Sequence, residues 1–116
     1  MTHAPMPRFS ICGIDELPDR VDGNVTHILS ILDPSWPDID HLQPFPADRR
    51  KIIRFHDVFQ PSEEKVLPDH VHVGDILAFG SQFAIDRQVP AGAHLLVHCH
   101  MGISRSTAAM IMILAQ

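Results

Sequence analysis

A cysteine and an arginine six residues apart, in the segment HCHMGISRST (residues 98–107), are the residues of this sequence best suited to chemistry. Cys99 can act as a nucleophile once its thiol ionises, and the planar guanidinium of Arg105 can hold two oxygens of a phosphate at once. Gly102 lies between them and lets the backbone turn tightly. This spacing predicts a phosphate-binding loop with a reactive thiol at its base.

One apolar run leads into this segment and a second follows it, which predicts a strand, a short loop and a helix that begins near Arg105. The N–H groups at a helix N-terminus converge on bound anions, and they lower the pKa of a nearby thiol from ~8.5 into the range of about 3.5–7.5. Ser106 can donate a hydrogen bond to the sulfur and assist its departure. The arrangement permits attack of Cys99 on a phosphate ester and hydrolysis of the resulting phosphocysteine by water.

The elements that must position this loop alternate between strand and helix patterns along the chain. Strands are expected at residues 8–14, 25–32, 51–56 and 94–99, with short helical turns in the connections, and a long helix is expected to begin at Pro68 and to end before PAG (90–92). The last strand is almost wholly apolar, which is typical of strands covered on both faces by helices. We therefore expect an α/β fold with a mainly parallel central sheet flanked by helices. The phosphate-binding loop would lie between the last strand and a buried helix, at the carboxyl end of a central strand.

Length and composition narrow the classes of function. The 116 residues predict a single domain, 1–116, and a net charge of −5 without a basic run argues against nucleic-acid binding. The longest apolar stretch, AAMIMILA, is too short to span a bilayer, and no secretory leader is visible, so no membrane partner is expected. With only Cys12 and Cys99, we expect no disulfide framework, two reduced thiols and a cytoplasmic protein.

The segment HCHMGISRS resembles the H-C-x-x-G-x-x-R-S signature of the cysteine-dependent protein tyrosine phosphatase superfamily. The order of the surrounding elements resembles the dual-specificity-phosphatase-like branch. The resemblance implies that Cys99 is the nucleophile, Arg105 the phosphate clamp, Ser106 the partner of the thiolate, and His98 the residue that fixes the loop geometry. It also implies that the phosphate is bound by the loop, which comprises His100, Met101, Gly102, Ile103, Ser104 and Arg105. Alternatively, His98 is a packed strand-end histidine and Ser106 a plain helix cap.

A general acid must protonate the leaving group. The resemblance favours Asp57, because dual-specificity-like enzymes carry their acid after the third strand. Asp38 ends the string WPD (36–38), which matches the acid loop of the tyrosine-specific branch but follows the second strand, one element too early. Asp40 and Asp69 are further alternatives, and each of these carboxylates could instead be a solvated loop residue.

The resemblance implies a phosphomonoester hydrolase without cofactor or metal. The expected substrate is phosphoprotein, on phosphotyrosine and alternatively on phosphoserine or phosphothreonine, or a small phosphomonoester. The chain has no Tyr to wall a deep phosphotyrosine pocket, and its loop has no Lys of the kind that serves polyanionic lipids. The nine histidines show no spacing typical of a zinc site.

Several alternatives stay open. A module that binds phosphate without turnover and a rhodanese-like sulfurtransferase could carry a similar loop, although the Arg105-Ser106 ending favours the phosphatase. In some phosphatases a second cysteine protects the nucleophile, so Cys12 could pair with Cys99, but a buried strand cysteine is the commoner case. Members of the resembled family continue through further helices, so we interpret the sequence as a fragment that lacks them. Nothing here predicts the oligomeric state.

Overall fold

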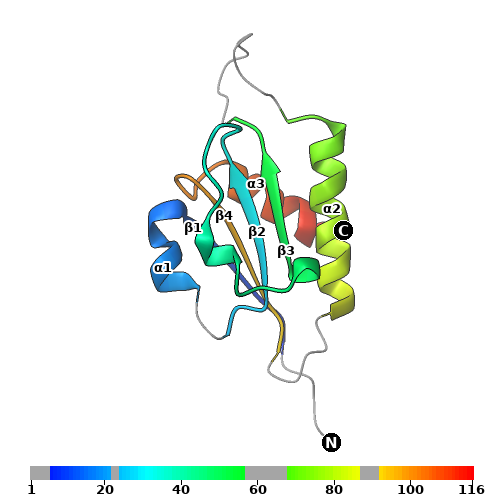
Figure 1. Ribbon diagram of the computed structural model, residues 1–116. Helices are drawn as coiled ribbons and strands as arrows, with labels where there is room; N and C mark the ends of the chain where they lie inside the picture. The colour runs from blue at the N-terminus through cyan, green and yellow to red at the C-terminus, as the bar shows by residue number, and fades with distance from the viewer. Residues whose placement is uncertain (1–5, 22–23, 57–67, 87–91) are drawn as a thin grey trace, which may run out of the picture.

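A four-stranded, all-parallel β-sheet forms the centre of the molecule (Figure 1). The computed structural model describes residues 6–21, 24–56, 68–86 and 92–116. The strands are β1 (Arg8–Gly13), β2 (His27–Leu32), β3 (Arg50–Arg54) and β4 (His94–Cys99). They lie side by side in the order β1-β4-β2-β3, so β4 is a central strand, as the sequence predicts.

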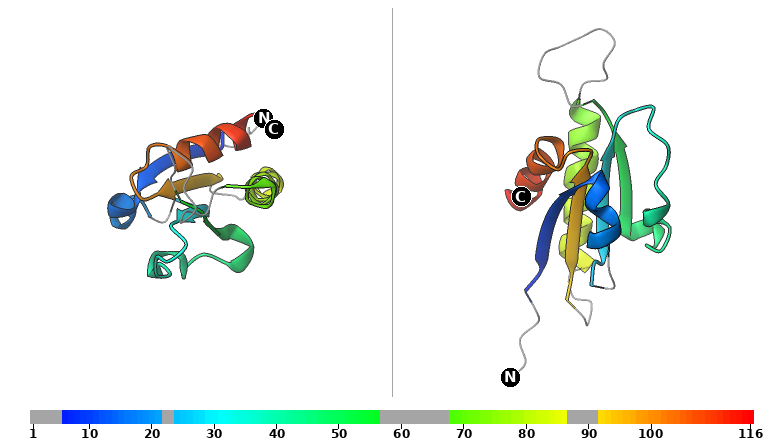
Figure 2. Two further views of the ribbon diagram at one scale, coloured as in Figure 1. Left: turned by 90° about the horizontal axis from the view of Figure 1, so that it is seen from above. Right: turned by 90° about the vertical axis from the view of Figure 1, so that its left-hand side faces the viewer.

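The described helices pack on both faces of this sheet, as Figures 1 and 2 show. The elements are α1 (Leu17–Arg20), which continues the short turn η1 (Ile14–Glu16), α2 (His70–Asp86), α3 (Arg105–Leu114), and the turns η2 (Asp40–Leu42) and η3 (Ala47–Arg49). This arrangement confirms the α/β fold with a parallel sheet flanked by helices. The strand that ends at the loop is followed by a helix, as expected.

The start of α2 differs from the expectation by two residues. Pro68 precedes the helix, which begins at His70. The Asp69 carboxylate accepts the backbone N–H groups of Val71 and His72, at 2.9 and 3.2 Å, and so satisfies two donors that have no partner within the helix. The same bonds, first that from His72, hold the pKa of Asp69 below its ordinary value. Asp69, one of the alternative acids, is therefore a helix cap.

The sheet separates two apolar clusters, because successive side chains of a strand point to opposite faces. The first cluster lies between the sheet and α2 and α3, and includes Leu29, Ile31, Ile76, Phe83, Val97, Cys99 and Met110. The second lies on the face covered by α1 and the β2–β3 connection, and includes Cys12, Leu17, Ile28, Leu42, Phe45 and Leu96. Cys99 thus belongs to the α2–α3 face, and Cys12 belongs to the other.

The loop helix α3 is buried along one side. Its residues Ala109, Met110 and Ile113 are buried, whereas Ile111 and Leu114 are exposed, so the helix that was expected to be buried is buried on one side only. Among the described residues, no helix combines the length and the apolar character needed to cross a membrane.

Candidate active site

Two glycines allow the loop after β4 to lie directly against the end of β1. Gly102 has a φ of 71°, and a Cβ added there would lie 2.5 Å from the backbone nitrogen of Gly13. A Cβ added at Gly13 would lie 3.0 Å from the carbonyl oxygen of His100. That oxygen accepts the backbone N–H of Ile14 at 3.0 Å. Gly13 is thus a supporting residue that the sequence analysis missed, and its only signal was a glycine at the carboxyl end of a strand.

Replacing Gly102 by Ala is expected to lower the free energy of unfolding by about 2 kcal/mol or more, because the residue combines a left-handed backbone with a close backbone contact. Gly74, in α2, is the matched control, since a Cβ there would meet nothing within 4 Å. Gly74→Ala is expected to raise stability by about 0.5–1 kcal/mol. Urea unfolding of the two variants measures both effects, and a neutral Gly102→Ala would contradict the steric argument.

The Cys99 thiol sits at the base of the loop, at the N-terminus of α3. The backbone N–H of Gly102 donates to Sγ at 3.2 Å, and Sγ lies 3.2 Å from the hydroxyl oxygen of Ser106. Burial raises the pKa of this thiol, but the Ser106 hydroxyl and the N–H groups of Ser106, Gly102 and Ile103 outweigh it. The net effect is a pKa below the ordinary value of 9.0. Cys99 is therefore held as an acidic, hydrogen-bonded thiol.

Cys12 has the opposite environment. Its pKa is raised to about 11, first by burial and then by the negative charge of Glu16. It pairs in register with His98 on β4, one residue before Cys99, so the two sulfurs project from opposite faces of the sheet. A disulfide needs Cβ vectors that point toward each other. The alternative pairing of Cys12 with Cys99 is therefore not found, and Cys12 is a free, buried strand cysteine, as the favoured interpretation expects.

His98 is a neutral, fully buried residue beneath the loop. Its Nε2 is hydrogen-bonded to the Ser30 hydroxyl on β2, and its Nδ1 lies 3.4 Å from the carbonyl oxygen of Cys99. Burial lowers its pKa to about 4, so the imidazole is uncharged at neutral pH. His98 thus links β4 to β2 at the residue that precedes Cys99.

Arg105 is buried and is hydrogen-bonded to residues that follow two other strands, β2 and β3. Its Nη1 donates to the Asp33 carboxylate at 2.7 Å and to the Phe55 carbonyl oxygen at 2.9 Å. Its Nε is buried and has no hydrogen-bond partner among the described residues. Asp33 follows the carboxyl end of β2 and was missed by the sequence analysis. Its signal was its place directly after a predicted strand, since the carboxyl ends of parallel strands meet at one edge of a sheet.

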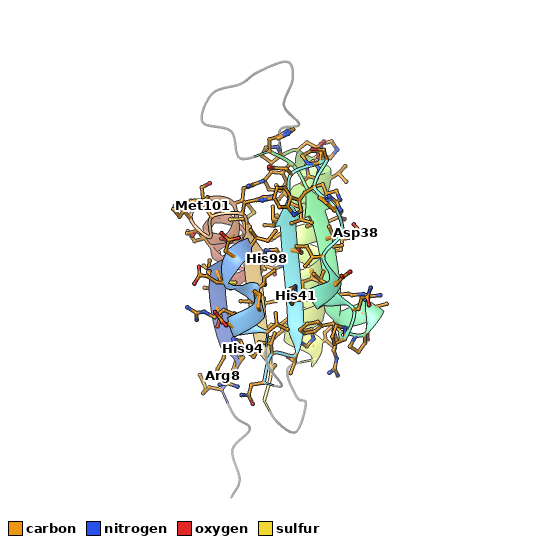
Figure 3. All side chains as sticks on the ribbon, turned by 60° about the vertical axis from the view of Figure 1, so that its left-hand side comes forward. Arg8, Asp38, His41, His94, His98 and Met101 are labelled. Carbon is orange, nitrogen blue, oxygen red and sulfur yellow. The ribbon has the colours of Figure 1, made fainter. Side chains whose placement is uncertain are left out.

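His100 lies on the side of the loop that contacts the residues after β2. The backbone N–H of Asp33 donates to Nε2 of His100 at 2.9 Å, and the rings of Trp36 and His100 meet edge to face with centroids 4.5 Å apart. Burial lowers the pKa of His100, Asp33 partly opposes this, and Arg105 adds to it. On the outside of the loop, Met101 and Ile103 are exposed, and Figure 3 shows Met101 projecting outward.

The candidate general acids lie in different parts of the chain. Asp57, the preferred one, lies outside the described residues. Asp38 is 84% exposed and pairs with the Arg54 guanidinium at 2.5 Å, in the connection that Figure 3 shows beside β3. Asp40 begins the turn η2, and Asp69 caps α2. The structure thus brings the Cys99 sulfur and the Ser106 hydroxyl together, and Arg105 precedes Ser106 at the start of α3.

No group of three or more His, Cys, Asp or Glu that could hold a metal ion occurs within the described part of the chain. The chain matches no protein-family model, no curated protein and no solved structure. The basis for a functional assignment is therefore the geometry of residues 98–106 together with the sequence motif.

Proposed function

We propose that the protein is a phosphomonoester hydrolase of the cysteine-dependent protein tyrosine phosphatase superfamily, in its dual-specificity-phosphatase-like branch. The observation that carries the proposal is that one short loop holds both an acidic Cys99 thiol and a buried Arg105 whose Nε has no partner among the described residues. A buried guanidinium with an unused donor is suited to an oxyanion. The N–H groups of the same loop add the donors that a phosphate needs.

In the first step, the Cys99 thiolate attacks phosphorus while the bond from phosphorus to the leaving oxygen breaks. Arg105 and the loop N–H groups bind the non-bridging oxygens and stabilise the negative charge on them in the transition state. Asp57, which follows β3 in the sequence, donates a proton to the leaving oxygen. The products are an alcohol or phenol and a phosphocysteine.

In the second step, water attacks the phosphocysteine and the sulfur–phosphorus bond breaks. The electron pair returns to sulfur, where the Ser106 hydroxyl and the Gly102 N–H, each 3.2 Å from Sγ, stabilise the thiolate that leaves. Asp57, now ionised, takes the proton from water, and inorganic phosphate departs. No cofactor enters either step.

The substrate proposed is phosphoprotein, on phosphotyrosine and alternatively on phosphoserine or phosphothreonine. Exposed Met101 and Ile103 on the loop, with half-exposed Trp36 nearby, provide apolar surface beside the phosphate site. Apolar surface favours esters with a large organic group over free polyanions. A low-pKa thiol needs a reducing compartment to stay reduced, which supports a cytoplasmic location.

The experiment that tests this function is phosphate release from an aryl phosphate, with sulfur transfer from thiosulfate as the counter-assay. We expect phosphate release and no sulfur transfer. Tight phosphate binding without turnover would instead support a binding module, and sulfur transfer would support a sulfurtransferase.

The two cysteines are expected to ionise in well-separated pH ranges. Because the Cys99 pKa is lowered from 9.0 and that of Cys12 is raised to about 11, thiolate absorbance at 240 nm should rise in two steps as the pH increases. Activity should rise with pH through the lower step. Cys99→Ser should remove that step, Cys12→Ser should keep it, and Ser106→Ala should move it upward. A single step near 9 would contradict the assigned environments.

A further inference from the structure

We propose that Asp33 is a positioning residue, which sets the orientation of the Arg105 guanidinium so that its Nε faces the bound phosphate. The inference rests on the proposed function of the loop, but it concerns a residue outside the motif. Asp33 reaches the site from β2, and it lies 72 positions before Arg105 in the sequence.

The two edges of the guanidinium differ in their hydrogen bonds. Nη1 is fully used, because it donates both to the Asp33 carboxylate at 2.7 Å and to the Phe55 carbonyl oxygen at 2.9 Å. Nε is buried and partnerless among the described residues. A planar guanidinium that is fixed at one nitrogen by two acceptors cannot rotate freely, so the direction of its remaining N–H groups is also fixed.

The charges support the same assignment. The Arg105 side chain is only 6% exposed, and a buried cation is costly unless an anion compensates it. Asp33 provides that anion while remaining 37% exposed, so its own charge is partly solvated. Arg105 can therefore stay in place in the absence of substrate, and it meets an incoming phosphate without first having to reorient.

Asp33 is itself anchored on both sides. Its backbone N–H donates to His100 of the loop at 2.9 Å, and its carbonyl oxygen accepts from Nη1 of Arg54 at 3.2 Å. The same Arg54 nitrogen donates to the Trp36 carbonyl oxygen at 2.6 Å. The turn after β2 is thus tied to both β3 and the phosphate loop, which fixes the backbone that carries the Asp33 carboxylate.

The test measures tungstate, a phosphate-like oxyanion, binding to the full chain in a Cys99→Ser background, where no covalent chemistry interferes. Trp36 is the only tryptophan and packs on His100, so its fluorescence should report binding directly. Asp33→Ala is expected to weaken tungstate binding by about tenfold or more, because the charge-assisted bond to Arg105 is lost. Asp33→Asn keeps an acceptor oxygen without the charge and should lose less. Asp48→Asn, at an exposed carboxylate of the turn η3, is the matched control and should bind as tightly as the parent.

With Cys99 intact, Asp33→Ala should lower kcat by about 10²-fold and raise KM less, because a misaimed donor costs most in the transition state. Circular dichroism shows which variants fold. If Asp33→Ala does not fold, the tungstate affinity and kcat of Asp33→Asn alone test the positioning role. Folded Asp33 variants that match Asp48→Asn in tungstate affinity and match the wild type in kcat would overturn the positioning role. A failure of the Cys99→Ser parent itself to bind tungstate would overturn the proposed function, and the inference with it.

Discussion

Replacing Cys99 by Ser is expected to abolish phosphate release while leaving oxyanion binding intact. The serine hydroxyl does not ionise near neutral pH, so the attacking group is lost, and removal of a nucleophile typically costs roughly 10⁴–10⁶ in kcat. In the proposed site the donors to the phosphate are Arg105 and backbone N–H groups, none of which the substitution changes. Stopped phosphate-release assays and tungstate titration by Trp36 fluorescence measure the two halves of this prediction.

Cys12→Ser is the matched control for this variant. The Cys12 sulfur lies on the other face of the sheet and has a pKa of about 11, so its removal should leave kcat unchanged. Turnover well above the buffer rate in Cys99→Ser would remove this thiol from the mechanism. A loss of activity in a folded Cys12→Ser protein would show that the second cysteine takes part.

Replacing Asp57 by Asn is expected to slow the hydrolysis of phenyl phosphate by ~10²–10⁴. A general acid matters most when the leaving oxygen is basic, because that oxygen then needs a proton as the bond breaks. Hydrolysis of a nitrophenyl ester should therefore slow distinctly less. In the pH profile the acidic limb, which reflects ionisation of Cys99, should persist, and the basic limb, which reflects loss of the acidic proton, should flatten.

The Asp38→Asn variant distinguishes between Asp57 and Asp38 as the general acid. Asp38 pairs with Arg54 and is 84% exposed, so its neutral variant should keep the leaving-group dependence of the wild type. The opposite pattern, with a leaving-group-dependent loss in Asp38→Asn and none in Asp57→Asn, would assign the acid to the WPD string at residues 36–38.

The α/β fold and the loop were predictable from the sequence because both depend on local patterns. Short apolar runs alternate along the chain with segments whose apolar residues recur at helical spacing. This alternation predicts a parallel sheet, because parallel strands need crossover connections and helices that cover them. Likewise, the Cys99–Arg105 spacing with Gly102 between them predicts a tight turn into a helix. A φ of 71° at Gly102 and the hydrogen bonds around the Cys99 sulfur agree with this prediction. Asp57 lies outside the described residues, and its role stays a prediction.

Other features were decided only by the tertiary structure. The ion pair of Asp33 with Arg105 joins residues 72 positions apart, and the contact of Gly102 with Gly13 joins the loop to a strand at the start of the chain. Neither follows from a local pattern, because strand order and register depend on how the whole sheet packs. Register also separates Cys12 from Cys99: an offset of one residue places their side chains on opposite faces. The sequence by itself thus determined which residues could react, and the packing of the sheet determined which residues hold them in place.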